Sequence, residues 1–329
     1  MNYFVLIDGN AILHRAYHAL PPLTAPDGSV VNAVYGFTSI LMKLFHDLKP
    51  THMAVAFDRP EPTFRKTLFK GYQGKRPEMD DALVSQIPKV QDMVRAFGIP
   101  IYEAAGYEAD DVLGSIAAQI QTLNFKIKTE RIDEIIIVTG DRDILQLVDD
   151  HVKVFMPIKG LSEGKLFGVQ EVIEKMGVTP AQIPDLKALM GDASDNYPGI
   201  AGIGPKTAVD LIARYGSVEE MYGKVKGKRK KGKGEEGKRS AISFQLSAGI
   251  KEKLLKGEES ARMSKDLATI RTDAPVDIEE LRSVTTLDTP EAREKLSELH
   301  FPSLVKRLGN AKEETQEKRE KKSEQLELV

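Results

Sequence analysis

The feature that most constrains the fold is an apolar run that ends in two carboxylates. Residues 134–138 read Glu-Ile-Ile-Ile-Val, and a Thr-Gly turn then leads to Asp141 and Asp143. A run rich in β-branched residues and bounded by polar ones is typical of a buried strand in a parallel sheet. Residues 144–148 then read as the start of a helix. A strand, a tight turn and a helix N-terminus together form the place where open α/β sheets keep their active sites.

Three more predicted strands in the first 150 residues, at 3–7, 52–57 and 99–103, also lead into acidic residues. These residues are Asp8, Asp58, Glu108, Asp110 and Asp111. Taken singly, each has an ordinary explanation, because acids at helix starts serve as caps or favour the helix dipole. If the strands are parallel, however, all of them gather at one edge of the sheet together with the 141/143 pair. The repetition predicts an acidic site rather than a set of unrelated caps.

Many carboxylates in one crevice repel one another unless protons or cations intervene. The chain has no cysteine, and oxygen-only ligands suit hard cations, so we expect Mg²⁺ or Mn²⁺. Two such ions roughly 4 Å apart can activate water and stabilise both oxygens of an in-line phosphoryl displacement. A phosphatase with an aspartate nucleophile is a weaker alternative, because such enzymes want Asp-x-Asp after the first strand and Asn10 stands there.

Composition bounds the class of protein. The 329 residues are 41% hydrophobic and carry a formal net charge of −2, which suits a soluble globular chain of two domains. The absence of cysteine excludes disulfides, thiol catalysis and cysteine-bound zinc, and it fits a reducing, cytosolic setting. The N-terminus lacks the basic region of a signal peptide, and no apolar run reaches the ~20 residues of a membrane helix.

From residue 179 the chain is predicted to be helical, and it contains a glycine-rich turn. Gly202 and Gly204 precede Lys206 and Thr207 at the start of a predicted helix. Exposed N–H groups at such a helix start bind phosphate well, and the lysine would add charge. A plain turn between two helices is the alternative. The turn is not a P-loop, since no Gly-x-x-x-x-Gly-Lys-Ser/Thr follows a strand.

Two stretches concentrate basic residues. Residues 63–79 interleave aromatics with Arg65, Lys75 and Arg76 and lack an apolar face, so we expect the stretch to be exposed. It could bind single-stranded nucleic acid or be a solvated surface. Residues 224–239 are rich in Lys, Arg and Gly and predict a flexible loop. A charged tail after residue 308 is predicted to be disordered.

Several short motifs follow one another along the chain: Asp8, 14–17 (His-Arg-Ala-Tyr), 34–37 (Val-Tyr-Gly-Phe), 57–58 (Phe-Asp), 106–111 (Gly-Tyr-Glu-Ala-Asp-Asp), 139–143 (Thr-Gly-Asp-Arg-Asp), 191–196 (Gly-Asp-Ala-Ser-Asp-Asn) and 202–208 (Gly-Ile-Gly-Pro-Lys-Thr-Ala). Jointly, these motifs resemble the 5′→3′ exonuclease domain of bacterial DNA polymerase I, within the flap endonuclease superfamily. The likeness runs from about residue 3 to Leu308 in the expected order.

The resemblance implies a PIN-like (resolvase-like) α/β domain, a parallel sheet flanked by helices, over 1–178, with an arch region at about 63–80. A helix-three-turn-helix DNA-binding region would follow over 179–308, then the tail at 309–329. It also implies two metal sites, the first formed by Asp8, Asp58, Glu108, Asp110 and Asp111 and the second by Asp141, Asp143, Asp192 and Asp195. Family members further hold a K⁺ on carbonyls of the glycine turn, here expected around Gly202 to Gly204.

Catalytic and DNA-binding roles are implied in the same way. The catalytic set would be Asp8, Asp58, Asp141, Lys75 and Arg76. The DNA-binding set would be Arg15, Tyr35, Phe37, Arg65, Tyr72, Lys75, Arg76, Gly202, Gly204, Lys206 and Thr207. Two features depart from the family pattern: Gln73 stands where the arch usually has a lysine after its tyrosine, and 224–239 looks like an insertion.

The sequence therefore predicts a Mg²⁺-dependent 5′ nuclease that removes 5′ flaps and RNA primers during replication and repair. We expect it to be a cytoplasmic, nucleoid-associated monomer whose partner is DNA with flaps, nicks or RNA primers, with no membrane association and no polymerase activity. It would be a stand-alone nuclease or the N-terminal part of a longer protein. The alternatives are a DNA-binding module with weak or lost catalysis, and a PIN-type ribonuclease acting on single-stranded RNA.

Overall fold

The computed structural model describes residues 2–123, 126–127, 130–159, 163–226, 246–278 and 282–309. The chain forms two compact units, and neither is continuous in sequence. The sheet unit comprises 1–61, 78–168 and 271–329, and the helical unit comprises 62–77 and 169–270. The structure thus divides the chain differently from the linear boundary expected near residue 178. Most of the predicted loop at 224–239, and the tail beyond Gly309, lie outside the described residues.

The sheet unit is built on six strands in the order β3-β2-β1-β6-β7-β8, all parallel except the edge strand β8. Their bounds are β1 Tyr3–Asp8, β2 His52–Ala56, β3 Ile101–Tyr102, β6 Glu134–Val138, β7 Val152–Lys159 and β8 Glu163–Phe167. The chain builds outward from β1 through β2 to β3 and then returns to place β6 on the other side of β1. The gap between β1 and β6 is therefore the topological switch point, where such sheets bind ligands.

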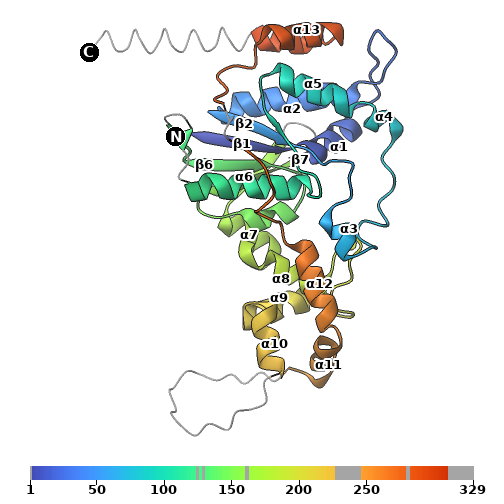
Figure 1. The fold of residues 1–329 in the computed structure, drawn as a ribbon, viewed down its shortest axis with the longest axis vertical. Helices are drawn as coiled ribbons and strands as arrows, with labels where there is room; N and C mark the ends of the chain where they lie inside the picture. The colour runs from blue at the N-terminus through green and yellow to red at the C-terminus, as the bar shows by residue number, and fades with distance from the viewer. Residues whose placement is uncertain are drawn as a thin grey trace, which may run out of the picture. The chain divides into compact units, whose positions relative to one another are not determined.

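Helices cover both faces of the sheet (Figure 1). On one face, Val5 and Ile7 of β1 join a core formed with α1, α2, α5 and the C-terminal helical residues. On the other face α6 packs against β1 and β2. The helices and short strands of this unit are α1 Gly9–Ala19, α2 Asn32–Leu48, α4 Asp81–Val84, α5 Ile87–Ala96, α6 Ala109–Leu123, β4 Lys126–Ile127, β5 Glu130–Arg131, η1 Asp143–Leu147 and α13 Pro290–Glu298. The expected α/β sheet is confirmed.

Helices α4 and α5 are separate because Pro88 stands in the first turn of α5 and a proline cannot continue a helix from the preceding turn. One local expectation for the sheet unit was wrong. The helix expected after Asp143 is a short 3₁₀ segment, η1.

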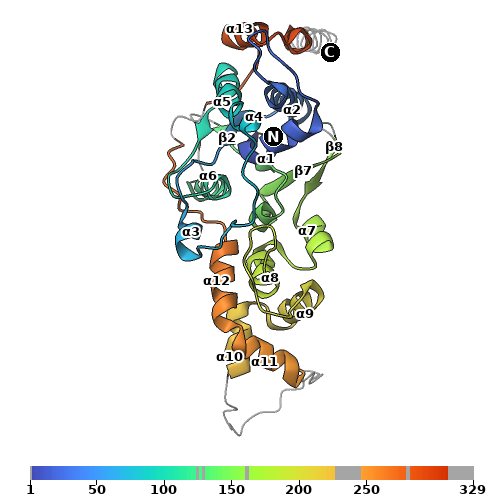
Figure 2. The same cartoon turned by 90° about the vertical axis from the view of Figure 1, so that its right-hand side faces the viewer.

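The helical unit packs α12 alongside α8 (Figure 2). Its elements are α3 Phe64–Leu68, α7 Val169–Met176, η2 Pro180–Gln182, α8 Ile183–Met190, α9 Pro205–Tyr215, α10 Val218–Lys226, α11 Ala248–Lys256 and α12 Glu258–Ala268. Helix α8 buries seven of its eight residues. Two of these are charged, and each is paired: Asp185 with Lys265, and Lys187 with Asp192. Burial of charge is tolerated because of this pairing.

The basic stretch that includes α3 is not uniformly exposed, contrary to expectation. Arg65 is 2% exposed and donates to the carbonyls of Leu267 and Thr269 at the C-terminal end of α12. Tyr72 is 4% exposed and belongs to an apolar cluster with Tyr197 and Leu267. A guanidinium suits a helix C-terminus because the last carbonyls lack partners within the helix. Within the described residues, no helix combines the length and apolarity needed to span a bilayer.

Candidate acidic site and glycine turn

The centre of the candidate site is Asp8, which closes β1 and caps α1. It is 4% exposed, and its two oxygens accept hydrogen bonds from the Ala11 backbone N–H at 2.9 Å and from the Thr139 hydroxyl at 2.6 Å. The Thr139 hydroxyl in turn accepts from the Asp141 backbone N–H at 2.9 Å. One threonine after β6 therefore ties the end of β1 to the start of the Asp141 turn.

The second strand end is joined to α6 through Asp58. Its carboxylate accepts from the Ala109 backbone N–H at 2.7 Å, and its own N–H donates to the Asn10 side-chain oxygen at 3.0 Å. Ala109 opens α6, and Asp110 follows in the same first turn. The carboxyl end of β2 thus fixes the start of the helix that carries the next acid.

Five carboxylates, here called the acidic edge, lie close enough for their charges to act on one another. They are Asp8, Asp58, Glu108, Asp110 and Asp141. Burial, reinforced by the charges of Asp58 and Asp141, raises the pKa of Asp8 to about 7 despite its two hydrogen bonds. Burial and the charges of Asp141, Asp8, Asp58 and Glu108 raise the pKa of Asp110 well above its ordinary value. Carboxylates held this close are the donor set that a hard divalent cation would neutralise, so the residues present fit such an ion.

Asp143 follows Asp141 of the acidic edge by two residues. Its backbone N–H donates to an Asp141 carboxylate oxygen at 2.8 Å, and Asp143 itself opens η1. Both carboxylates are half-buried. Asp111 has different partners, because its carboxylate accepts from the backbone N–H groups of Glu108 and Arg271.

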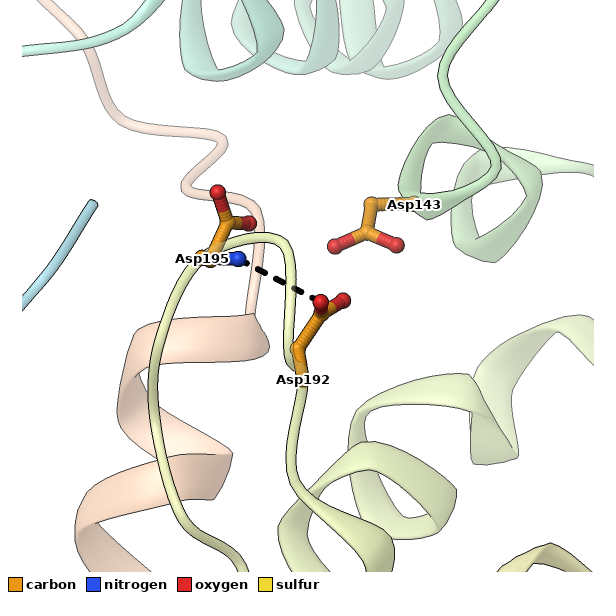
Figure 3. A group of neighbouring side chains, drawn as sticks. All are labelled: Asp143, Asp192 and Asp195. Atoms are coloured by element: carbon orange, nitrogen blue, oxygen red, sulfur yellow. Dashed lines mark hydrogen bonds between the residues drawn. The ribbon is translucent and has the colours of Figure 1, made fainter. Parts of the chain in front are cut away.

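The remaining two predicted metal ligands, Asp192 and Asp195, belong to the helical unit. They lie on the loop after α8, where the Asp195 backbone N–H donates to Asp192 at 3.3 Å; Figure 3 draws both, together with Asp143 of the sheet unit. Burial would raise the pKa of Asp192, but hydrogen bonds from Lys187 and Ser194 outweigh it and hold that pKa below its ordinary value. Asp195 pairs with Arg76 at 2.6 Å.

The glycine turn is braced from two helices of the same unit. The Gly199 N–H donates to the Ser264 hydroxyl at 3.1 Å, and its carbonyl accepts from the Ser260 hydroxyl at 2.5 Å. The Gly202 carbonyl accepts from the Lys253 ammonium at 3.0 Å. Gly204 caps the N-terminus of α9, and nothing lies within 4 Å of where its Cβ would be. The open helix start is the feature that suits a phosphate; the predicted K⁺ stays a prediction.

The predicted DNA-binding residues divide by exposure. Lys75, Arg76, Gly202, Gly204 and Lys206 are exposed, and Arg15, Tyr35 and Thr207 are half-buried. Three others offer almost no surface: Phe37 is 0% exposed and stacks on Phe57, while Arg65 and Tyr72 are buried as described above. A buried side chain cannot contact DNA unless its surroundings open, so the structure gives these three packing or capping roles.

Three residues that matter to the geometry were missed in the sequence analysis. Thr139 links two strand ends, Asn10 holds the Asp58 turn, and Lys187 is the counter-charge of Asp192. A signal existed for Thr139, because it stands between a buried strand and an acid. None existed for Lys187, because a lysine in a helix is usually solvated.

The fold and the acidic edge define the class of protein: an α/β enzyme with a carboxylate-rich switch point, joined to a helical unit. The family described as 5'-3' exonuclease, N-terminal resolvase-like domain, matches residues 3–177, and its partner, the C-terminal SAM fold, matches 178–291. The chain belongs to this 5'-3' exonuclease family, whose members are enzymes. The resemblance noted in the sequence is confirmed.

Relatives of two lengths match the chain. DNA polymerase I of Bacillus subtilis (strain 168) is 39% identical over 95% of this chain and 33% of the relative, so the chain spans about a third of that protein. A 5'-3' exonuclease of Aquifex aeolicus (strain VF5) is 34% identical over 93% of this chain and 95% of the relative.

Solved structures share the fold at low sequence identity. The T5 D15 protein, crystallised with metal ions, superimposes with a TM-score of 0.61 at 19% identity, covering 95% of this chain and 99% of that one. The catalytic core of Rad2 in complex with a DNA substrate gives a TM-score of 0.59 at 16% identity, over 93% and 91% of the two chains. These likenesses support the fold.

Proposed function

We propose that this chain is a divalent-cation-dependent, structure-specific 5′ nuclease that hydrolyses phosphodiesters in DNA. The observation that carries the proposal is the acidic edge at the β1/β6 switch point, where burial and mutual repulsion raise the pKa of Asp8 to about 7. A protein does not keep such a group for stability, and strongly shifted carboxylates in a cluster are typical of functional sites. Membership of the 5'-3' exonuclease family supports phosphodiester hydrolysis as the chemistry.

Within this proposal, the acidic edge binds the first Mg²⁺ or Mn²⁺ through Asp8, Asp58, Glu108 and Asp110. As the sequence resemblance implies, Asp141, Asp143, Asp192 and Asp195 are proposed as the second ligand set. When bound, such ions activate a water and stabilise the charge that develops on the phosphate oxygens. The chain's own part is to fix the carboxylates, and the Thr139 hydroxyl does this by orienting both Asp8 and the Asp141 turn.

DNA is held by a different part of the chain in this proposal. The backbone N–H groups at the start of α9 take a phosphate, and Lys206 and Thr207 add contacts. Lys75 and Arg76, both exposed, face the 5′ strand in the role of the family's arch cations. Contacts to the backbone alone predict little base specificity. The structural neighbours crystallised with DNA substrate, or with DNA and metal ions, support this assignment.

The biological substrates follow from the same proposal. They are 5′ flaps, nicks and RNA primers that arise during replication and repair. The similarity to DNA polymerase I relatives, of which this chain spans about a third, supports the role in primer removal. The similarity to the 5'-3' exonuclease of Aquifex aeolicus supports nuclease activity.

The test is cleavage of a 5′-end-labelled flap duplex by wild type and by Asp141→Ala, with Mg²⁺ or with EDTA. We expect cutting near the flap junction that needs Mg²⁺ and falls by at least about 10³-fold in the variant, while flap binding changes little. Single-stranded RNA of the same length serves as the competing substrate. Tight flap binding without cutting in either Mg²⁺ or Mn²⁺ would leave a DNA-binding module, and preferential RNA cleavage would leave a ribonuclease.

A further inference from the structure

Helix α6 carries a stripe of three polar residues, Asp111, Ser115 and Gln119, at four-residue spacing. Residues at this spacing lie on one face of a helix. Two of them, Asp111 and Ser115, have no exposed surface. A buried polar stripe on a helix that packs against a sheet must have hydrogen-bond partners, because unpaired polar groups are costly to bury.

Each of the three has a partner on one stretch of backbone, residues 271–276, here called the return segment. The Arg271 N–H donates to Asp111 at 2.8 Å, and the Ala274 N–H donates to Ser115 at 2.8 Å. The Gln119 amide donates to the Val276 carbonyl at 3.1 Å. The stripe therefore holds the return segment against α6 through three hydrogen bonds, which follow the same order along α6 and along the return segment.

The second carboxylate oxygen of Asp111 accepts a hydrogen bond from the backbone just before α6. While one oxygen accepts from Arg271, the other accepts from the Glu108 backbone N–H at 3.0 Å. This contact spans the first turn of α6 and fixes the backbone between Glu108 and Asp110. Both oxygens of a fully buried carboxylate thus serve backbone donors, and the helix N-terminus favours its negative charge.

Asp110 and Asp111 face different surroundings although they are adjacent. Successive helix residues are not on the same face. The charges that act on Asp110 are those of Asp141, Asp8, Asp58 and Glu108. Asp111 instead joins the stripe on the face that meets the return segment.

We propose that Asp111 is a positioning residue, which anchors the return segment and holds Glu108 and Asp110 in place, rather than a metal ligand as the sequence resemblance implied. This inference rests on the metal site proposed above. It changes the assignment of one of the five acids of the first site, and it gives Ser115 and Gln119 the separate role of holding the return segment against α6.

The experiment compares Asp111→Asn with Asp110→Asn in metal-free protein and with Mn²⁺ as the probe. An asparagine offers one acceptor where two backbone N–H groups need one each. In Asp111→Asn we therefore expect hydrogen exchange at 269–277 to speed up by about tenfold and the melting temperature to fall by roughly 2–8 °C. Loss of flap cleavage in this variant should appear in kcat rather than KM and be largely rescued by higher Mn²⁺.

Asp110→Asn should behave in the opposite way. Exchange at 269–277 stays at the wild-type rate, and Mn²⁺ binding weakens by at least about tenfold without rescue of cleavage. Ser115→Ala is the matched structural control: it should speed up exchange around Ala274 and leave kcat unchanged. The proposal is overturned if Asp111→Asn loses Mn²⁺ affinity as Asp110→Asn does while 269–277 keeps wild-type protection.

Wild type alone decides the matter if Asp111→Asn does not fold. Exchange at 269–277 should be the same in EDTA and in saturating Mg²⁺, because the anchor is made in both states; faster exchange on Mg²⁺ binding would mean that Asp111 leaves Arg271 for the metal. Failure of the proposed function is a separate result, since wild type would then bind no Mn²⁺ at micromolar to millimolar concentrations while the anchor remained.

Discussion

Asp8 shows how one residue can be held in an unfavourable state for a purpose. Its two hydrogen bonds, from Ala11 and Thr139, favour the ionised carboxylate, yet burial and the charges of Asp58 and Asp141 outweigh them. The hydrogen bonds therefore fix the direction of the carboxylate without relieving its charge. A bound cation would supply the positive charge that stabilises the ionised Asp8 carboxylate, and this is the physical reason to expect metal affinity at this residue.

The shift at Asp8 predicts how stability depends on pH in the absence of metal. The folded protein keeps the proton up to a pKa of about 7, whereas the unfolded chain releases it near 3.8. Between these values the folded state binds more protons, so the free energy of unfolding falls as pH rises and levels off above about 7. The three-unit difference corresponds to at most about 4 kcal/mol.

The measurement is urea unfolding in EDTA from pH 5 to 8, for wild type and Asp8→Asn. Asparagine can accept from Ala11 and donate to the Thr139 hydroxyl, so the fold should survive, and the downward slope should become shallower. Mg²⁺ should remove most of the loss at neutral pH in wild type. Equal slopes for the two proteins would assign the pH dependence to other groups.

The sequence resemblance implies that Gln73 is where this chain departs from the arch of its family. Its backbone has a positive φ of 54° and its N–H donates to the Asp195 carbonyl at 2.8 Å. Neither feature depends on the side chain, so Gln73→Lys should fold as wild type does. If residues 63–80 receive the 5′ strand as proposed, an ammonium added at position 73 should raise kcat by roughly threefold to tenfold. Gln73→Met is the control for side-chain length, and single-turnover cleavage is the measurement; an unchanged rate in Gln73→Lys would mean that Lys75 or Arg76 already supplies the charge.

In the glycine turn before α9, one glycine is needed for folding and another is suited to binding. Gly199 has a positive φ of 59°, and a Cβ there would lie 2.2 Å from the Gly191 nitrogen. Gly204 has an ordinary φ of −94° and open space around its Cβ position. The first glycine is therefore required by the fold, while the second leaves room at a helix start for something outside the chain.

Two alanine substitutions test this distinction. Gly204→Ala should keep the wild-type melting temperature but raise the dissociation constant for nicked duplex DNA about tenfold, because a methyl group stands where a phosphate would approach. Gly199→Ala should instead lower the melting temperature sharply or prevent folding. Fluorescence anisotropy and thermal melts give the two readouts. Unchanged DNA affinity in Gly204→Ala would remove the start of α9 from the binding surface.

Elements with strong local patterns were predictable from the sequence, and contacts between distant segments were not. The run before Thr139 and the acid at position 8 fix β6 and β1, because β-branched runs and parallel strand ends follow from local chemistry. The burial of Arg65 depends on carbonyls two hundred residues later in the chain, at Leu267 and Thr269. The hydrogen bond between Asp111 and Arg271 spans 160 residues. Hydrophobic periodicity within one segment does not report such partners, which is why the exposure of Arg65 was predicted wrongly and the anchor of Asp111 was not predicted.

At the scale of the whole molecule, each unit is completed by a segment from another part of the chain. Residues 62–77 join the helical unit, and the residues from Arg271 onward join the sheet unit. Neither unit should therefore be stable when the chain is cut near residue 178, because the cut separates 62–77 from the helical unit and the residues from Arg271 onward from the sheet unit.

The charge of the whole chain makes the last prediction specific. Its net charge is only −2, so any attraction to DNA must come from local cations such as Lys206, which is exposed at the start of α9. Log affinity falls as log salt rises, and each cation that neutralises a phosphate makes this slope steeper by about 0.9. We therefore expect binding to a nicked duplex to weaken steeply between 50 and 200 mM NaCl. Lys206→Ala should reduce the magnitude of the slope by about one. Lys295, which pairs with Glu298 on α13 of the sheet unit, provides the control: Lys295→Ala should leave the slope unchanged. If both variants keep the wild-type slope, the start of α9 does not contact the DNA backbone.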